Sequence, residues 1–155
     1  MNPAASPSDP ACPLCGPAPA GLLWEDARLR VIHMDDSPFP GYIRIIWRRH
    51  VAEMTDLSPA ERGDLMQAIY QVEALQRQIL QPEKINLASL GNQVPHLHWH
   101  LIPRWHADPC FPDAIWAPNR HDPEQQAAWQ RQAHTLTTQR VPLLRKAITD
   151  AFEGV

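Results

Sequence analysis

Three histidines alternate with apolar residues in the segment Pro95–Arg104, whose sequence is PHLHWHLIPR. Side chains of an extended strand point to its two faces in turn, so His96, His98 and His100 would share one face. Neighbouring histidines would then stand roughly 6.6 Å apart, close enough for two of them to hold one phosphate or one metal ion. A single histidine is more often a core residue, but packing does not explain three in strict alternation. The segment therefore predicts a strand with one core face and one reactive face.

The surrounding sequence predicts the elements that position this strand. Runs of β-branched and aromatic residues bounded by turn residues indicate further short strands. The capping box of Ser58 and Glu61, with Pro59 in the first turn, begins a helix whose apolar stripe continues to Leu80. The predicted strands are residues 22–26, 28–34, 42–47, 84–90 and 96–102, the main helix is 59–80, and terminal helices 123–137 and 143–152 are separated by Pro142. This order indicates an antiparallel α+β domain.

Composition excludes several classes of protein. The 155 residues suit one domain with a sizeable core, and a net charge of -3 argues against bulk capture of DNA or RNA. The longest uncharged stretch, residues 85–103, holds three histidines, so we expect no transmembrane segment. The first residues lack the basic and apolar regions of a signal peptide, and three cysteines are an odd number. We expect a cytoplasmic protein with reduced thiols.

The segment His96-Leu97-His98-Trp99-His100-Leu101-Ile102 resembles the signature of the histidine triad (HIT) family. The resemblance extends over about residues 12–116 and is strongest to a bacterial subgroup with the PHLHWHLIPR motif and an N-terminal CxxC. It implies an α+β fold in which one main helix and C-terminal helices pack on a HIT-like antiparallel sheet of about five strands. We expect a flexible proline-rich lead over 1–11, a HIT domain over 12–120 and a helical extension over 121–155 packed on that domain. HIT proteins are commonly homodimers, so a homodimer is expected.

HIT enzymes hydrolyse or transfer nucleotidyl groups, so the resemblance implies a nucleotide or a nucleotide conjugate as substrate. Phosphoramidates and dinucleoside polyphosphates are both candidates. An imidazole with an ordinary pKa near 6.5 is largely unprotonated at neutral pH and is a good nucleophile for phosphorus. His98 matches the family's nucleophile and would form a covalent nucleotidyl-histidine. His100 would hydrogen-bond the phosphate or the leaving oxygen.

The other expected site residues surround the phosphate and the ribose. Asn92 and backbone N–H groups near Gly91 would meet the charge on the phosphate oxygens, without an obligatory magnesium ion. Asp35 matches the position that holds ribose hydroxyls, with an ordinary turn aspartate as the alternative. The resemblance thus implies the catalytic residues His96, His98, His100 and Asn92, and the substrate-binding residues Asp35, Tyr42, Asn86, Gly91 and Gln93.

Two positions depart from the family pattern. Tyr42 stands where members often carry histidine after Pro-Gly, and Asn92 stands where they often carry glutamine after glycine. A phenol can still donate a hydrogen bond to phosphate, and asparagine keeps the amide of glutamine at a shorter reach. These departures leave the choice among substrates open.

A second constellation concerns metal binding. In several HIT relatives a cysteine pair and two histidines bind zinc, which implies a structural zinc site here at Cys12, Cys15, His50 and His96. Two thiolates and two imidazoles suit a closed tetrahedral zinc site. The alternatives are an unliganded reduced pair and a redox pair, although a redox Cys-x-x-Cys usually opens a helix and none is indicated after Cys12. No organic cofactor is expected.

Two other functional classes remain open. In a metallohydrolase, all three triad histidines would bind a catalytic metal ion that activates water. Alternatively, the chain is a nucleotide-binding HIT protein that has lost turnover through Tyr42 and Asn92. As partners we expect neither a nucleic acid polymer nor a membrane.

Overall fold

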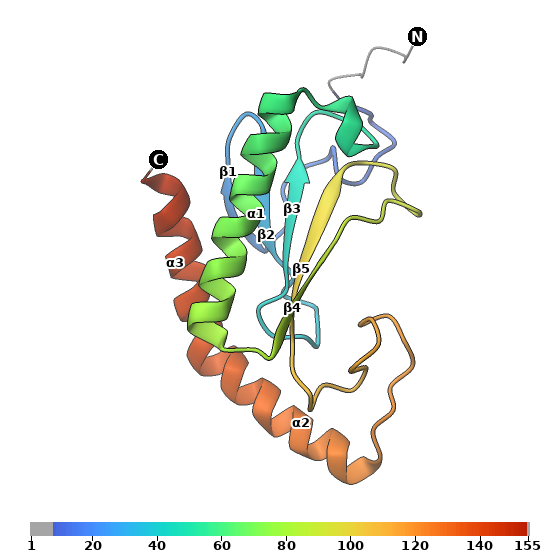
Figure 1. Cartoon of the computed structure of the whole chain (residues 1–155), viewed down its shortest axis with the longest axis vertical. Helices are drawn as coiled ribbons and strands as arrows, with labels where there is room; N and C mark the ends of the chain where they lie inside the picture. The colour runs from blue at the N-terminus through green and yellow to red at the C-terminus, as the bar shows by residue number, and fades with distance from the viewer. Residues whose placement is uncertain (1–7, 155) are drawn as a thin grey trace.

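The computed structural model describes residues 8–154, so most of the expected lead over 1–11 lies outside the described residues. Five strands form one antiparallel sheet in the order β1-β2-β3-β5-β4. The strands are β1 (Leu22–Glu25), β2 (Leu29–His33), β3 (Ile43–Trp47), β4 (Lys84–Ala88) and β5 (His98–Arg104). Together with a main helix and helices near the C-terminus, this sheet confirms the predicted α+β fold (Figure 1).

The main helix α1 (Pro59–Leu80) covers one face of the sheet (Figure 1). Its predicted capping box is present, because Ser58 Oγ accepts from the Glu61 N–H and the Glu61 carboxylate accepts from the Ser58 N–H. A short 3-10 helix, Met54–Asp56, precedes it. The core between helix and sheet contains Leu65, Ile69, Val72, Ile43, Ile45 and Leu101. The opposite face of β3 and β5 is therefore left for polar side chains.

One turn between β2 and β3 is fixed by a close approach to α1. Gly41 has a φ of +74°, and a Cβ there would lie 2.3 Å from a Leu80 methyl carbon, so any other residue would be strained and would displace the Leu80 side chain. The buried side chain of Gln76 donates to the carbonyl oxygens of Gly41 and Leu101, at 2.8 and 2.9 Å. These contacts place the next residue, Tyr42, beside β5.

Strand β5 begins at His98, two residues later than predicted. The His96 N–H donates to the Val94 carbonyl in a turn, and the Leu97 N–H donates to the Val51 carbonyl outside the regular ladder. His96 thus lies before the strand. Its ring therefore does not have to point to the same face of the sheet as the rings of His98 and His100.

The C-terminal helices differ from the prediction in how they are joined. Helix α2 (Pro123–Thr135) continues through a π-helical turn, η2 (Leu136–Arg140), into α3 (Val141–Glu153). Pro142 does not separate the helices; it lies in the first turn of α3, where a missing N–H is tolerated. Helix α3 packs on α1 and β1 with a buried stripe of Leu144, Ile148 and Phe152 (Figure 1).

The segment from Trp105 to His121 has no regular secondary structure but is held at its start. Arg104 and Asp108 form a buried ion pair through two contacts of 2.7 and 2.9 Å. The loop returns to the sheet at Trp116, whose ring meets that of His100 edge-on at 5.4 Å between centroids. Within residues 8–154, no helix combines the length and apolar character required to cross a membrane.

Candidate functional site

His98 and His100 lie on the face of β5 opposite the core. Their rings meet edge-on with centroids 4.9 Å apart, and both residues are buried. Leu101 is fully buried on the other side, against α1. The alternation in the sequence therefore separates core from site along this strand, as predicted.

The tautomer of His98 follows from its hydrogen bond to the backbone. Nδ1 lies 2.6 Å from the carbonyl oxygen of His96, and because a carbonyl only accepts, Nδ1 carries the proton. Burial lowers the pKa of His98, and the charge of Arg44 lowers it further, against the effect of this hydrogen bond. The ring is thus held neutral with a free lone pair on Nε2, which is the state that a nucleophile requires.

His100 is held by a different partner, the hydroxyl group of Tyr42, which contacts His100 Nδ1. The Arg44 Nε–H donates to the same hydroxyl oxygen at 3.2 Å. Arg44 lies on β3 directly opposite His100 in the strand register. Burial lowers the pKa of His100 to about 4, with smaller contributions from His98 and Arg44. His100 is therefore a neutral imidazole at physiological pH.

A cavity of about 340 Å³ opens over these two histidines. Its wall is made by the segment Leu90–Val94, which contains Gly91, Asn92 and Gln93, together with Leu14, Arg44 and Trp116. Gly91 adopts a φ of +79°, which favours glycine. The structure thus brings Asn92, Gly91 and Gln93 to one cavity with His98 and His100.

Asp35 and Asn86 line two flanking cavities. Asp35 lies in a cavity of about 290 Å³ that shares Leu14 and Arg44 with the central one. Its carboxylate contacts His33 Nδ1 and Arg145 Nη1 of α3, both at 2.6 Å, and the hydrogen bond with His33 is the main cause that lowers the pKa of Asp35.

Asn86 lines the other flanking cavity, an open groove of about 530 Å³ that shares Leu90 and Trp116 with the central one. Its Oδ1 accepts from Arg104 Nη1 at 2.8 Å. The structure does not bring Asn86 into the cavity of His98, and it places the Tyr42 hydroxyl against His100 and Arg44.

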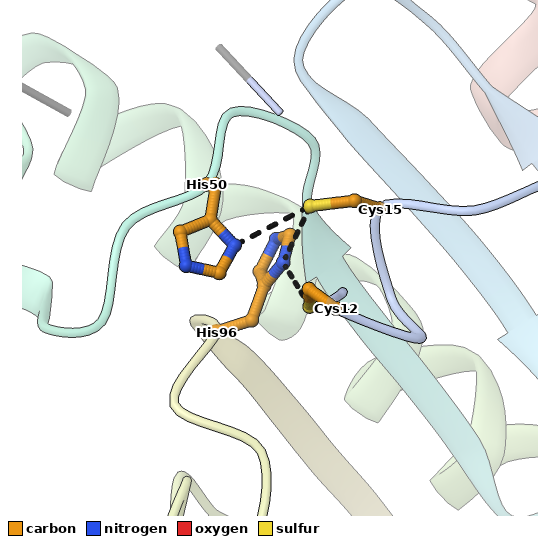
Figure 2. Close-up of side chains that lie close together, drawn as sticks. All are labelled: Cys12, Cys15, His50 and His96. Carbon is orange, nitrogen blue, oxygen red and sulfur yellow. Dashed lines mark hydrogen bonds between the residues drawn. The ribbon is translucent and has the colours of Figure 1, made fainter. Parts of the chain in front are cut away.

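His96 turns toward a separate cluster with Cys12, Cys15 and His50 (Figure 2). Its Nδ1 lies 3.3 Å from Cys12 Sγ and 3.4 Å from Cys15 Sγ, while His50 Nδ1 lies 3.3 Å from Cys15 Sγ. The potential ligand atoms all lie within 4.8 Å of one another. Residues from three segments far apart in the sequence thus converge on one point.

The donor set and its spacing fit a tetrahedral metal ion. Zn–S and Zn–N bonds of about 2.3 and 2.0–2.1 Å at tetrahedral angles place sulfur and nitrogen ligands roughly 3.6 Å apart, close to the separations observed. His96 Nε2 lies 2.5 Å from the Trp47 carbonyl oxygen, so Nε2 carries the proton and Nδ1 offers its lone pair to the cluster. The cluster could hold a metal ion without any change of tautomer.

Comparison with known proteins decides the family. A model of the HIT domain matches residues 16–107, more than half of the chain. The chain belongs to the HIT domain family. The match includes the triad, as the resemblance implied.

Several HIT relatives show the extent of this similarity. The bis(5'-nucleosyl)-tetraphosphatase [asymmetrical] of Schizosaccharomyces pombe is 30% identical over 83 residues, which are 50% of this chain and 46% of that protein. An AP-4-A phosphorylase of Mycobacterium tuberculosis is 26% identical over 98 residues, or 59% and 50% of the two chains. The chain therefore spans about half the length of these curated relatives. A solved histidine triad protein from Marinobacter aquaeolei has 28% identity and a TM-score of 0.58, covering 78% of this chain and 92% of its own.

Two residues of this HIT site were not predicted from the sequence. Arg44 lines two of the cavities and contacts Tyr42, and Trp116 packs edge-on against His100. Arg44 carried a signal, because it is the one charged residue in the predicted strand 42–47. Trp116 carried none, since it lies in an irregular loop whose return to the sheet no local pattern indicates.

Proposed function

We propose that this HIT protein is a nucleotidyl hydrolase or transferase that acts on the α-phosphate of nucleotide conjugates through a covalent nucleotidyl-His98. The observation that carries the proposal is the hydrogen bond of His98 Nδ1 to the His96 carbonyl, which leaves Nε2 as the only lone pair of the ring. Nε2 would attack phosphorus, the leaving group would depart, and water would then open the phosphorus–nitrogen bond. The names of the curated relatives, a tetraphosphatase and a phosphorylase, support this class of substrate.

The surrounding groups suit the charge that develops in this reaction. Asn92 and the backbone near Gly91 line the central cavity with His98, where donors could stabilise the phosphate oxygens. Arg44 adds a positive charge in the same cavity, and His100 lies beside the nucleophile. This arrangement would supply a nucleophile, hydrogen-bond donors and a group next to the leaving atom.

The three adjoining cavities favour a substrate with two arms. The central cavity would hold the phosphate, and the two flanking cavities join it through Leu14 and Arg44 on one side and through Leu90 and Trp116 on the other. Asp35 would bind ribose hydroxyls in the first of these. Phosphoramidates and dinucleoside polyphosphates both have a group on each side of the scissile phosphate, so both fit.

We further propose that Cys12, Cys15, His50 and His96 hold a structural zinc ion. The four ligands would complete its coordination, leaving no open position for water. The ion would tie residues 12–15 to the segment before β5. His96 faces this cluster, so the alternative in which all three triad histidines share one catalytic metal is disfavoured.

A product assay tests the proposed activity. The protein is incubated with adenosine and guanosine phosphoramidates and with dinucleoside polyphosphates, and the products are separated by chromatography. We expect a nucleoside monophosphate to be released from at least one substrate class. Tight binding of nucleotides with no product after long incubation would instead identify a binding protein and contradict the proposal.

A further inference from the structure

We propose that Tyr42 and Arg44 form a proton relay with His100, through which the neutral His100 protonates the leaving group. This inference rests on the proposed nucleotidyl transfer and adds the source of the proton. The relay occupies the position where the chain departs from the usual histidine after Pro-Gly, and it includes Arg44, for which the sequence predicted no role.

The hydrogen bond from Arg44 leaves the Tyr42 hydroxyl proton available for the relay. The Arg44 Nε–H can only donate, so the Tyr42 oxygen accepts that bond and keeps its own proton. In the relay this proton goes to His100 Nδ1, the other contact of the oxygen. The relay therefore requires that His100 Nδ1 is unprotonated and that the ring proton is on Nε2. In the relay the two neighbouring histidines have opposite tautomers: His98 has a free lone pair on Nε2, and His100 has an N–H there.

With this tautomer, His100 needs a proton on Nδ1 when Nε2 gives its proton to the leaving group. A buried imidazole with a pKa of about 4 is not an imidazolium at neutral pH, so it has no spare proton to give. If Nε2 lost its proton without compensation, the ring would become an imidazolate anion. Tyr42 lies on the other nitrogen and can supply the missing proton. Burial raises the pKa of Tyr42, which keeps the phenol protonated until the reaction begins.

Atoms and charges balance through the relay. When His98 Nε2 bonds to phosphorus, the bond to the leaving atom breaks and that atom takes the proton of His100 Nε2. His100 Nδ1 takes the hydroxyl proton of Tyr42, and the resulting phenolate is stabilised by the Arg44 guanidinium. In the second step, water attacks phosphorus and gives its proton to His100 Nε2, while Nδ1 returns a proton to Tyr42. The phosphorus–nitrogen bond breaks, and His98 regains its lone pair.

The environment of Arg44 suits this role. Among residues 8–154, no carboxylate forms an ion pair with Arg44, so its charge is not already neutralised. Its guanidinium carbon lies 5.8 Å from the centre of the Tyr42 ring. A positive charge this near would favour the phenolate over the phenol.

The test compares two leaving groups in the variant Tyr42→Phe, which keeps the ring but removes the hydroxyl. One substrate is an adenosine 5'-phosphoramidate with an alkylamine leaving group, which must be protonated to depart. The other is the 4-nitrophenyl ester of AMP, whose leaving group departs as a stable anion. The rate measured is that of leaving-group release in the first turnover, because the second step is common to both substrates. We expect this rate to fall about 10²-fold or more for the phosphoramidate, with a fall on the nitrophenyl ester at least tenfold smaller. Tyr70→Phe removes the same hydroxyl from the exposed tyrosine of α1 and should change neither rate.

Each outcome decides one point. Equal losses on both substrates would show that Tyr42 has only a structural role and would overturn the relay while leaving the proposed function intact. Wild-type protein that turns over neither compound nor any dinucleoside polyphosphate would overturn the proposed function, whereas turnover of a polyphosphate alone would overturn the relay as a means of protonating an amine. If Tyr42→Phe does not fold, Arg44→Gln is measured in its place. Loss of the guanidinium should again reduce phosphoramidate turnover more than ester turnover, and an unchanged ratio would overturn the relay.

Discussion

The carbonyl oxygen of His96 accepts a hydrogen bond from Nδ1 of His98 at 2.6 Å. The ring of His96 belongs to the cluster with Cys12 and Cys15, so one residue joins the candidate metal centre to the candidate nucleophile. Its side chain is oriented by the cluster, and its backbone orients His98. Disturbing the cluster should therefore change the position of His98. His96 is the only residue that the cluster and the triad share.

The first prediction concerns zinc. Protein purified without added metal should contain close to one zinc ion per chain, because the four ligands lie within 4.8 Å of one another. Cys15→Ser should lose the ion and unfold at a lower temperature, although a domain with its own core depends on zinc less than the roughly 10–16 kcal/mol of isolated zinc-binding peptides. Elemental analysis and thermal unfolding check both effects.

A matched control is Cys110→Ser, which changes the buried cysteine outside the cluster. This variant should retain its zinc, even if its unfolding temperature changes. Full-length protein without metal, in which the thiols of Cys12 and Cys15 titrate freely, would contradict the prediction.

The second prediction is that His98 is the residue that becomes nucleotidylated. Rapid quench of the reaction, followed by mass spectrometry of the peptide that spans the triad, should show an added nucleotide on His98. His98→Ala should abolish this adduct and lower turnover by several orders of magnitude, because the tautomer of His98 leaves Nε2 free as a nucleophile in the central cavity. His134→Ala, on α2, serves as the control.

An active His98→Ala protein would reject the covalent mechanism. Turnover near the wild-type rate, combined with sensitivity to chelators, would favour the metallohydrolase alternative instead.

The third prediction concerns Asn92 in the wall of the central cavity. If its amide stabilises the transition state, Asn92→Ala should lower turnover by about 10²-fold or more and weaken nucleotide affinity less. Steady-state kinetics and equilibrium binding separate the two effects. Asn119→Ala, whose amide bonds to Gln126 near the start of α2, is the matched control. Small and equal losses of affinity and turnover would mean that Asn92 is only a turn residue.

The fourth prediction is a loss of stability between about pH 6.5 and pH 4. Burial lowers the pKa of His100 from 6.5 to about 4, so over this range the unfolded state binds a proton that the folded state does not. The free energy of unfolding should therefore fall as pH decreases through this window, by up to about 3 kcal/mol for this one group. Urea unfolding at a series of pH values measures the slope.

The variant His100→Gln should have a shallower slope, because the buried titrating group is gone. The matched control is His106→Gln, which replaces an exposed histidine of the loop after β5. A slope that is the same in His100→Gln and the wild-type protein would contradict the assignment to His100.

Much of the fold could be predicted from local sequence. The capping box at Ser58 and the apolar stripe to Leu80 predicted α1, because both signals act between residues three or four positions apart. The alternation around His98 and His100 predicted their common face for the same kind of reason. The prediction was wrong at Pro142, which was expected to separate two helices. Proline cannot occupy the interior of a helix, but the π-helical turn that precedes Pro142 allows it to lie in the first turn of α3. No local pattern indicates that turn.

The triad pattern was by itself enough to indicate the family and the common face of His98 and His100 on β5, and the resemblance to that family implied the residues of a metal centre. Tertiary structure decided how those residues are divided: His96 turns to the cysteines, the tautomer of His98 is set by a carbonyl, and His100 contacts Tyr42. It also decided that Arg44 and Trp116 border the site and that Asn86 lies in a neighbouring groove. The physical reason is that tautomers and pKa values are set by hydrogen-bond partners and burial. Those partners come from segments far apart in the chain, which no local spacing specifies.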